Sequence, residues 1–198
     1  MVSWSSVSKG SSTSYCGAWL PLGVHDCDHG FILPHEWFAF MYTAFKPIFF
    51  KVFMGVEASH AKRHLAKFWG MVKHDDPRRS SLQHDHESMH AFTIPGWIHG
   101  DAVPCTKYDS LEVCSWGSML SKWIWYASGY FLKVKNVSAD KKKNTKHRFM
   151  EVMTWSFRAL TIGRWPDKDW EGKPFPKGSR ADMNKGKWLA DGPLSKSN

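Results

Sequence analysis

The sequence predicts an α+β fold, and three observations support that prediction. Apolar residues recur at three- and four-residue spacing over 58–72 and again over 149–160, which is the pattern of amphipathic helices. Between these helices, the stretches 92–103, 111–120 and 123–134 are apolar-rich, short and separated by polar residues, which is typical of strands. A chain of 198 residues with 12 Trp and 13 Phe can bury one sizeable core.

The first elements of the chain are expected to be an arm and a helix. Residues 1–30 open with a Ser-rich stretch that has neither helical nor strand periodicity, so we expect a poorly ordered N-terminal arm. Pro34 can stand in a first helical turn. The run from His35 to Lys46 is apolar almost all round and predicts a buried helix, which Pro47 ends or kinks.

A polar stretch divides the chain near residue 90. Residues 74–90 predict an exposed connection between a helical subdomain, 31–90, and a strand-rich α+β subdomain, 91–163. The last helix of the second subdomain should stop at Gly163, since glycine suits the position that follows a helix. Pro and Gly dominate residues 164–198, which predicts a basic tail of doubtful order.

The most apolar stretch, Trp37 to Val56, has about the length of a membrane span. Lys46, Pro47 and Lys51 lie inside it, and each Lys near a bilayer centre costs roughly 2.5–3.5 kcal/mol on insertion scales. We therefore expect buried core and no transmembrane insertion. Peripheral membrane attachment through this stretch is the weakest alternative.

The cysteines predict the location of the protein, and the motifs missing from the sequence exclude two classes of function. The four cysteines contain no C-x-x-C pair, and the chain begins without a signal-peptide pattern, which predicts reduced thiols and an intracellular location. The phosphate-binding loop, the glycine-rich dinucleotide fingerprint and the G-x-S-x-G elbow are all missing from the sequence. Glycine-loop nucleotide binding and elbow-type hydrolysis therefore have no support.

Ten of the eleven histidines lie in the first half of the chain, which raises a metal hypothesis. The run from His25 to His29 offers several donors but lacks the second ligand pair of a zinc site. His60 and His64 lie one turn apart on a predicted helix, yet the Glu of the H-E-x-x-H pattern is missing, so solvated histidines are favoured. Weak metal affinity at most is expected from the loop histidines His84, His86 and His90.

The net charge of +9 is placed unevenly. Residues 1–132 carry 11 of the 27 Lys/Arg and 11 of the 18 Asp/Glu, so residues 133–198 carry 16 against 7. Lys and Arg neutralise phosphates and aromatic rings stack on unpaired bases, so this basic, Trp-containing third favours nucleic acid. The residues expected to bind it are Lys141, Lys142, Lys143, Lys146, Arg148, Arg164, Lys173, Lys177 and Arg180. The alternative is a solvated basic tail in which Trp165 and Trp170 pin a loop onto the domain.

Asp101 is the leading candidate for a catalytic carboxylate, because it stands at the end of a predicted strand, where a carboxylate can hold Mg²⁺. A two-metal phosphoryl-transfer site needs several converging carboxylates. The acids available as partners are Asp109, Glu112, Glu151, Asp167 and Asp169. Nothing in their spacing directs them toward Asp101, and a turn Asp that caps backbone amides is the alternative.

Seven short motifs occur in a set order along the chain. They are Leu33-Pro34-His35-Glu36-Trp37-Phe38, Phe68-Trp69, Asp76-Pro77-Arg78, Ile94-Pro95, His99-Gly100-Asp101-Ala102-Val103-Pro104, Ser115-Trp116-Gly117-Ser118-Met119-Leu120, and Trp165-Pro166 through Asp169-Trp170. In this order they resemble a large multicopy protein family of dinoflagellate genomes that looks transposon-derived. The resemblance covers residues 31–192, and the fifth and sixth motifs are its most distinctive parts.

That family is in turn similar to cut-and-paste transposases with an RNase H-like core, in which an Asp at the end of the first strand binds a catalytic metal. Asp101 matches that position. The resemblance also implies a later Gly-Asp-Leu segment with a second acid and a Cys-x-x-Cys element, and this sequence contains neither. It therefore implies the N-terminal portion of such a protein, with a partial RNase H-like core, catalytically incomplete and nuclear.

Two functions are expected from these observations. The first is a truncated or repurposed transposase-like domain that binds nucleic acid through its basic C-terminal third, with DNA favoured over RNA and Mg²⁺ at Asp101 as a conditional cofactor. The second is a non-catalytic interaction protein or assembly subunit, whose aromatic surface and basic tail contact a protein partner.

Overall fold

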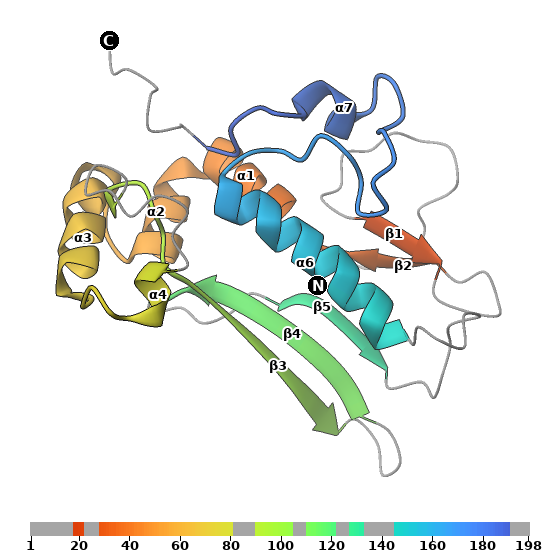
Figure 1. The fold of residues 1–198 in the computed structure, drawn as a ribbon, viewed down its shortest axis with the longest axis horizontal. Helices are drawn as coiled ribbons and strands as arrows, with labels where there is room; N and C mark the ends of the chain where they lie inside the picture. The colour runs from red at the N-terminus through yellow and green to blue at the C-terminus, as the bar shows by residue number, and fades with distance from the viewer. Residues whose placement is uncertain are drawn as a thin grey trace.

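The computed structural model describes residues 18–21, 28–80, 90–104, 110–121, 127–132 and 145–190. Helices and antiparallel strands occupy separate parts of the chain, so the predicted α+β class is confirmed (Figure 1). In chain order the elements are β1 (Ala18–Pro21), β2 (Asp28–Phe31), α1 (Pro34–Ala44), α2 (Lys46–Met54), α3 (Ala58–Met71), α4 (Pro77–Ser80), β3 (Gly96–Pro104), β4 (Ser110–Ser118), β5 (Ala127–Leu132), α6 (Thr145–Ile162) and α7 (Arg180–Asn184).

The main sheet has three antiparallel strands in the order β3-β4-β5. These are the three strands that the sequence predicts between residues 92 and 134. Ile98 lies opposite Trp116 in the register of β3 and β4, and the pairing of β4 with β5 shifts between Cys114 and Ser115. A second sheet pairs β1 with β2 inside and just after the predicted N-terminal arm, where no strand was expected. Residues 1–17 and 22–27 lie outside the described residues.

The apolar stretch from Trp37 to Val56 folds as two helices instead of one. Phe45 separates α1 from α2, and Pro47 stands in the first turn of α2, where its missing N–H costs nothing. Pro47 predicts an end or a kink when it is interpreted from the sequence alone, so α2 was not expected. Within the described part of the chain, none of the helices has the length and apolar character that a membrane span requires.

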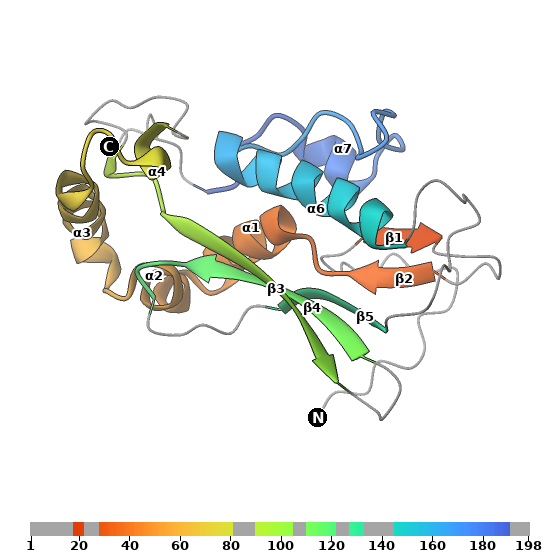
Figure 2. The same cartoon turned by 60° about the horizontal axis from the view of Figure 1, so that its bottom comes forward.

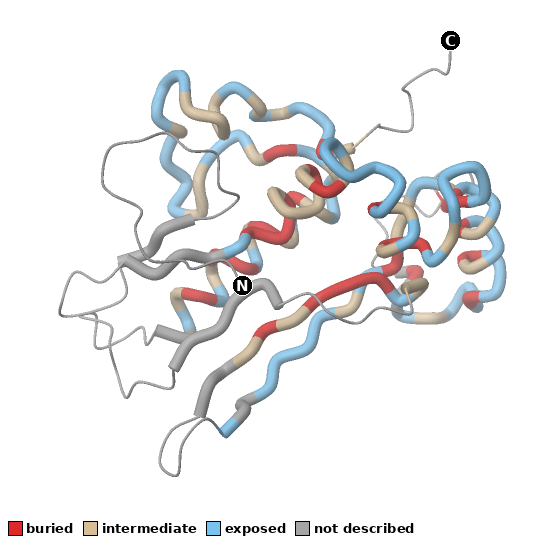
Figure 3. The backbone as a smooth tube through the Cα atoms, turned by 180° about the vertical axis from the view of Figure 1, so that it is seen from behind, coloured by how far each residue is buried: buried red, intermediate tan, exposed pale blue. Residues whose placement is uncertain are grey.

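The core lies where α1 and α6 meet each other and the inner face of the main sheet (Figures 2 and 3). Cys114 of β4 packs with Phe149 and Met153 of α6, while Trp116 packs against Phe157 with ring centroids 6.0 Å apart. A second cluster joins the side chains of α1, α2 and α3 to Trp116. Core contacts therefore cross residue 90, while the predicted division into subdomains there stays a prediction.

Two residues in the predicted exposed connection are buried. Arg79 is buried and donates from Nη1 to the carbonyl oxygen of Val72, 3.1 Å away. His90 is also buried and stacks on Trp69, with ring centroids 6.0 Å apart. The expectation of exposure over 74–90 is thus wrong at these two positions, because each side chain finds a partner on α3 or directly after it.

Residues 163–190, the C-terminal segment, fold back over α6 on the side away from the main sheet (Figure 2). Gly163 ends α6 in the left-handed region at φ 74°, as predicted, and its N–H donates to the carbonyl of Ala159. Trp165 is buried, and Arg164 forms an isolated antiparallel bridge with Trp188. The segment is therefore folded onto the protein instead of forming a loosely ordered tail.

Candidate nucleic-acid interface

Five of the predicted nucleic-acid contacts have described side chains, and all five lie on α6 or the C-terminal segment. Arg148 is on α6, and Arg164, Lys173, Lys177 and Arg180 are on the segment. Lys146 belongs to α6, although only its backbone is described, and Lys141, Lys142 and Lys143 lie outside the described residues. Residues 145–190 hold ten Lys/Arg and five Asp/Glu, so this stretch of the chain carries a net charge of +5.

Arg164 and Trp188 form the closest cation–aromatic pair of the segment. The guanidinium carbon of Arg164 lies 3.9 Å from the centroid of the Trp188 ring. Its Nη1 also donates to the carbonyl oxygen of Gly186 at 2.8 Å, which fixes the plane of the guanidinium. A guanidinium held in this way loses less conformational freedom when it binds a phosphate.

Two further arginines lie over tryptophan rings. Arg148 of α6 stands 5.5 Å from the centroid of Trp170, and Arg180 of α7 stands 5.8 Å from that of Trp165. The three arginines that were predicted to contact nucleic acid and that the structure describes thus each have a tryptophan partner. Cation–π contacts of this kind are attractive and restrict the position of the cation.

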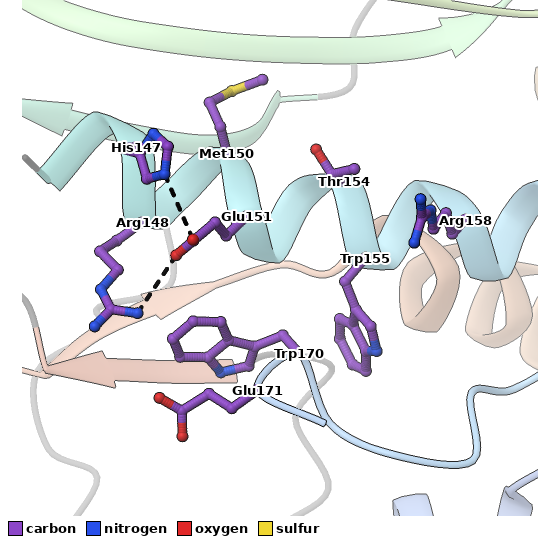
Figure 4. Close-up of a pocket in the computed structure, with 9 residues that line it drawn as sticks. All are labelled: His147, Arg148, Met150, Glu151, Thr154, Trp155, Arg158, Trp170 and Glu171. Carbon is purple, nitrogen blue, oxygen red and sulfur yellow. Dashed lines mark hydrogen bonds and ion pairs between the residues drawn. The ribbon is translucent and has the colours of Figure 1, made fainter. Parts of the chain in front are cut away.

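An open groove of about 640 Å³ separates α6 from the loop that carries Trp170 (Figure 4). Its charged lining residues are Arg148, Arg158, Glu151 and Glu171, together with the ionisable His147. Trp155 forms one wall, and its indole N–H donates to the carbonyl oxygen of Lys168 at 3.0 Å, which ties the loop to α6. The groove therefore has a fixed wall and mixed charge.

Carboxylates neutralise part of the positive surface. Glu151 lies 3.5 Å from His147 and 3.4 Å from Arg148, between the two side chains (Figure 4). Glu171 lies 2.5 Å from Lys173. The hydrogen bond to Glu171, with its charge, raises the pKa of Lys173, so this predicted contact stays protonated but already has an anionic partner. Exposed pairs of this kind contribute little to stability and can exchange with a phosphate.

The tryptophans of the C-terminal segment differ in burial: one packs in the core, and the others stay partly exposed. Trp165 is only 7% exposed and packs with Ala39 and Leu189, so its ring serves the core, as the alternative interpretation of this residue had it. Trp170 is half-buried against the first core cluster, whereas Trp188 remains 38% exposed. Base stacking needs an accessible ring face, so burial closes Trp165 to it, whereas Trp188 and Trp170 keep part of their surface exposed.

Asp101 is exposed and lies within β3, three residues before the end of the strand. It pairs with Val113, so it shares the sheet face opposite to that of Cys114 and Trp116, which enter the core. Glu151 is on α6, on the other side of the sheet, and the segment with Asp167 and Asp169 packs onto α6. The structure therefore does not bring these three acids to Asp101. Asp109 and the side chain of Glu112 lie outside the described residues.

A magnesium site does not fit the described surroundings of Asp101. In the ranges that the structure describes, no group of three or more His, Cys, Asp and Glu side chains could hold a metal ion. The assignment of Asp101 as a metal ligand stays a prediction.

Cys114 is buried, and burial raises the pKa of its thiol, which suits a protonated core side chain.

Several residues of this surface were not predicted from the sequence. Arg158 lines the groove, and the positions 148, 151, 155 and 158 follow the three- and four-residue spacing that places them on one face of α6. That spacing could have identified Arg158. Phe40 and Thr43 of α1 also border the C-terminal segment, and they carried no sequence signal because the contact is made only by the fold.

Comparisons with known proteins add no identification: no protein-family model, curated protein or solved structure matches this chain. The resemblance to transposon-derived proteins accordingly stays an expectation from the motifs.

Proposed function

We propose that this chain is a DNA-binding domain of transposase-like descent, which contacts the phosphate backbone through α6 and the C-terminal segment. The observation that supports this most directly is the pairing of Arg148, Arg164 and Arg180 with tryptophan rings, in a stretch of the chain that carries a net positive charge. Phosphate contacts supply most of the affinity in such interfaces, and arginine is well suited to them because its donors form a planar fork.

DNA rather than RNA, and a nuclear location, belong to the same proposal and depend on the resemblance. We do not assign a strand-transfer activity to the described residues, because Asp101 stands apart from Glu151, Asp167 and Asp169 across the sheet. A single carboxylate cannot assemble a two-metal site. The proposed activity is therefore binding alone.

The test is fluorescence anisotropy with labelled single- and double-stranded DNA at about 50 and about 200 mM salt. With six or more phosphate contacts, the affinity should fall roughly a thousandfold across this range. The triple variant Arg148→Gln, Arg164→Gln, Arg180→Gln should bind more weakly, with a slope of log K against log salt shallower by about 2.7, since each lost contact removes about 0.9.

A matched control removes the same charge from another part of the molecule, α3 and the residues after it. Arg63, Lys67 and Lys73 are exposed on or directly after α3, so their joint replacement by Gln changes the net charge equally. The proposal requires the control to retain most of the affinity. Equal loss in the two triple variants would place the contact elsewhere, and absence of binding at low salt would overturn DNA binding and favour the alternative, a protein partner for the basic surface.

A further inference from the structure

A second hollow, smaller than the groove, lies between α1 and the C-terminal segment. Its volume is about 310 Å³, which is at the small end of the range for ligand sites. Phe40 and Thr43 line it from α1, while Arg180, Lys187 and Trp188 line it from the segment. We call it the α1 hollow.

The charged residues that line the α1 hollow are all positive. Arg180 and Lys187 supply two cations, and no Asp or Glu is among the described residues that form the walls. Asn184 adds an amide that can both donate and accept hydrogen bonds. The groove on α6, by contrast, has Glu151 and Glu171 in its lining.

The aromatic wall of the α1 hollow is held in place before any ligand arrives. The Trp188 ring contacts the guanidinium of Arg164 at 3.9 Å, and a Cβ built on Gly163 would lie 3.5 Å from its Cζ3. The ring thus rests on the backbone at the end of α6 while 38% of the residue stays exposed. A ring fixed in this way offers a stacking surface at little further entropic cost.

We infer that the α1 hollow binds one unpaired nucleotide of a DNA strand, with the base on Trp188 and the phosphate between Arg180 and Lys187. A planar aromatic group joined to an anion matches a hollow with ring walls, two cations and no carboxylate. The inference rests on the proposed function, since the segment that forms the hollow also carries the other phosphate contacts. It deepens that function by predicting a preference for unpaired ends.

The experiment compares two labelled hairpins that share one duplex, the first blunt and the second with a short single-stranded overhang. Wild type should bind the overhang roughly tenfold more tightly, since one stacked base contributes on this scale. Trp188→Leu should remove the preference, so that the variant binds both hairpins with the same affinity. Equal binding of both hairpins by wild type would overturn the inference alone, whereas binding of neither would overturn the proposed function.

Two lysine variants test the same inference even if Trp188→Leu does not fold. Lys187→Gln alters a cation in the wall of the hollow, and Lys168→Gln removes an equal charge from an exposed site on the same segment outside it. Only Lys187→Gln should reduce the ratio of overhang to blunt affinity. An unchanged ratio would contradict the inference. Displacement of the overhang by sub-millimolar deoxyadenosine monophosphate would instead reassign the hollow to free nucleotides.

Discussion

His35 of α1 and Ser156 of α6 meet in the interior of the protein, with Nδ1 of the imidazole 2.8 Å from Oγ although the two residues are 121 positions apart. The same oxygen accepts the backbone N–H of His35 at 3.2 Å. Trp155 and Trp165 meet the imidazole edge-on, at centroid distances of 5.0 and 5.4 Å. This cluster joins α1 and α6 beneath the C-terminal segment, so it supports the proposed binding surface from inside.

The stability of the fold should depend on pH through His35. Burial lowers its pKa to about 3, from 6.5 for the exposed imidazole. The unfolded state therefore binds the proton more readily, so this contribution to stability is complete above about pH 6.5 and is lost as the pH falls toward 3, by roughly 1 kcal/mol per pH unit.

Urea unfolding of wild type and His35→Phe between neutral pH and about pH 4 isolates this contribution. The variant should be less stable at neutral pH, because Ser156 loses its partner at a cost of roughly 1–3 kcal/mol. The difference between the two proteins should shrink as the pH falls, since only wild type must protonate a buried imidazole. Parallel curves for wild type and variant would show that His35 is not the buried titrating group.

Two glycines should respond oppositely to alanine. Gly55 ends α2 at φ 68°, and a Cβ there would lie 2.6 Å from the carbonyl oxygen of Leu120. Gly70 is inside α3, and apart from its chain neighbours and the backbone of its own helix, a Cβ there would meet no atom within 4 Å. Gly55→Ala should destabilise by more than about 1 kcal/mol, through the strained φ and the backbone clash, while Gly70→Ala should stabilise by roughly 0.5–1 kcal/mol.

Thermal unfolding of the two glycine variants provides the comparison, because both make the same chemical change. Opposite shifts in midpoint are expected. If Gly55→Ala unfolded at the wild-type temperature, the close approach of α2 to the end of β4 would be wrong.

The sequence predicted those parts of the fold that depend on local signals. The apolar spacing of α3 and α6 and the stop at Gly163 are set by neighbouring residues, and the structure has all three. Buried polar groups could not be predicted in this way. His90 depends on Trp69, and His35 on Ser156, and such pairings exist only once distant elements have packed.

The candidate site, too, could be predicted from the sequence only in part. Charge counting identified the basic surface, since net charge needs no fold. The pairing of Arg164 with Trp188 needs the bridge between their backbones, and the burial of Trp165 needs the contact with α1. Neither is visible as a periodicity in the chain. The roles of individual tryptophans, as core or as exposed ring, could therefore not be assigned from composition.

The short helix α7 should depend on a reciprocal cap. Ser179 Oγ accepts the N–H of Asp182 at 3.1 Å, while the Asp182 carboxylate accepts the N–H of Gly178 at 3.0 Å. Ser179→Ala should lower local stability by about 1 kcal/mol. Hydrogen exchange should then accelerate at Met183 and Lys185, whose amides bond within the same turn, and stay unchanged in α3. Unchanged exchange at both amides would mean that the cap does not hold α7.

Removing one of the two acids of the groove should strengthen DNA binding. Glu151 pairs with both His147 and Arg148, so Glu151→Gln releases two donors and raises the net charge of the surface by one. One additional phosphate contact should steepen the slope of log K against log salt by about 0.9. The gain in affinity over wild type should therefore be roughly threefold larger at about 50 mM salt than at about 200 mM. Anisotropy titrations at several salt concentrations measure both quantities.

The matched control for this variant is Glu57→Gln, which removes an exposed carboxylate that pairs with Lys51 at 3.0 Å, before α3. Both variants raise the net charge equally, so long-range attraction alone would strengthen binding by a similar factor in each. A larger gain and a steeper slope for Glu151→Gln alone would locate phosphate contacts at the α6 groove. Equal gains would mean that the affinity for DNA depends only on the total charge of the protein, and the assignment of Arg148 to the interface would then be wrong.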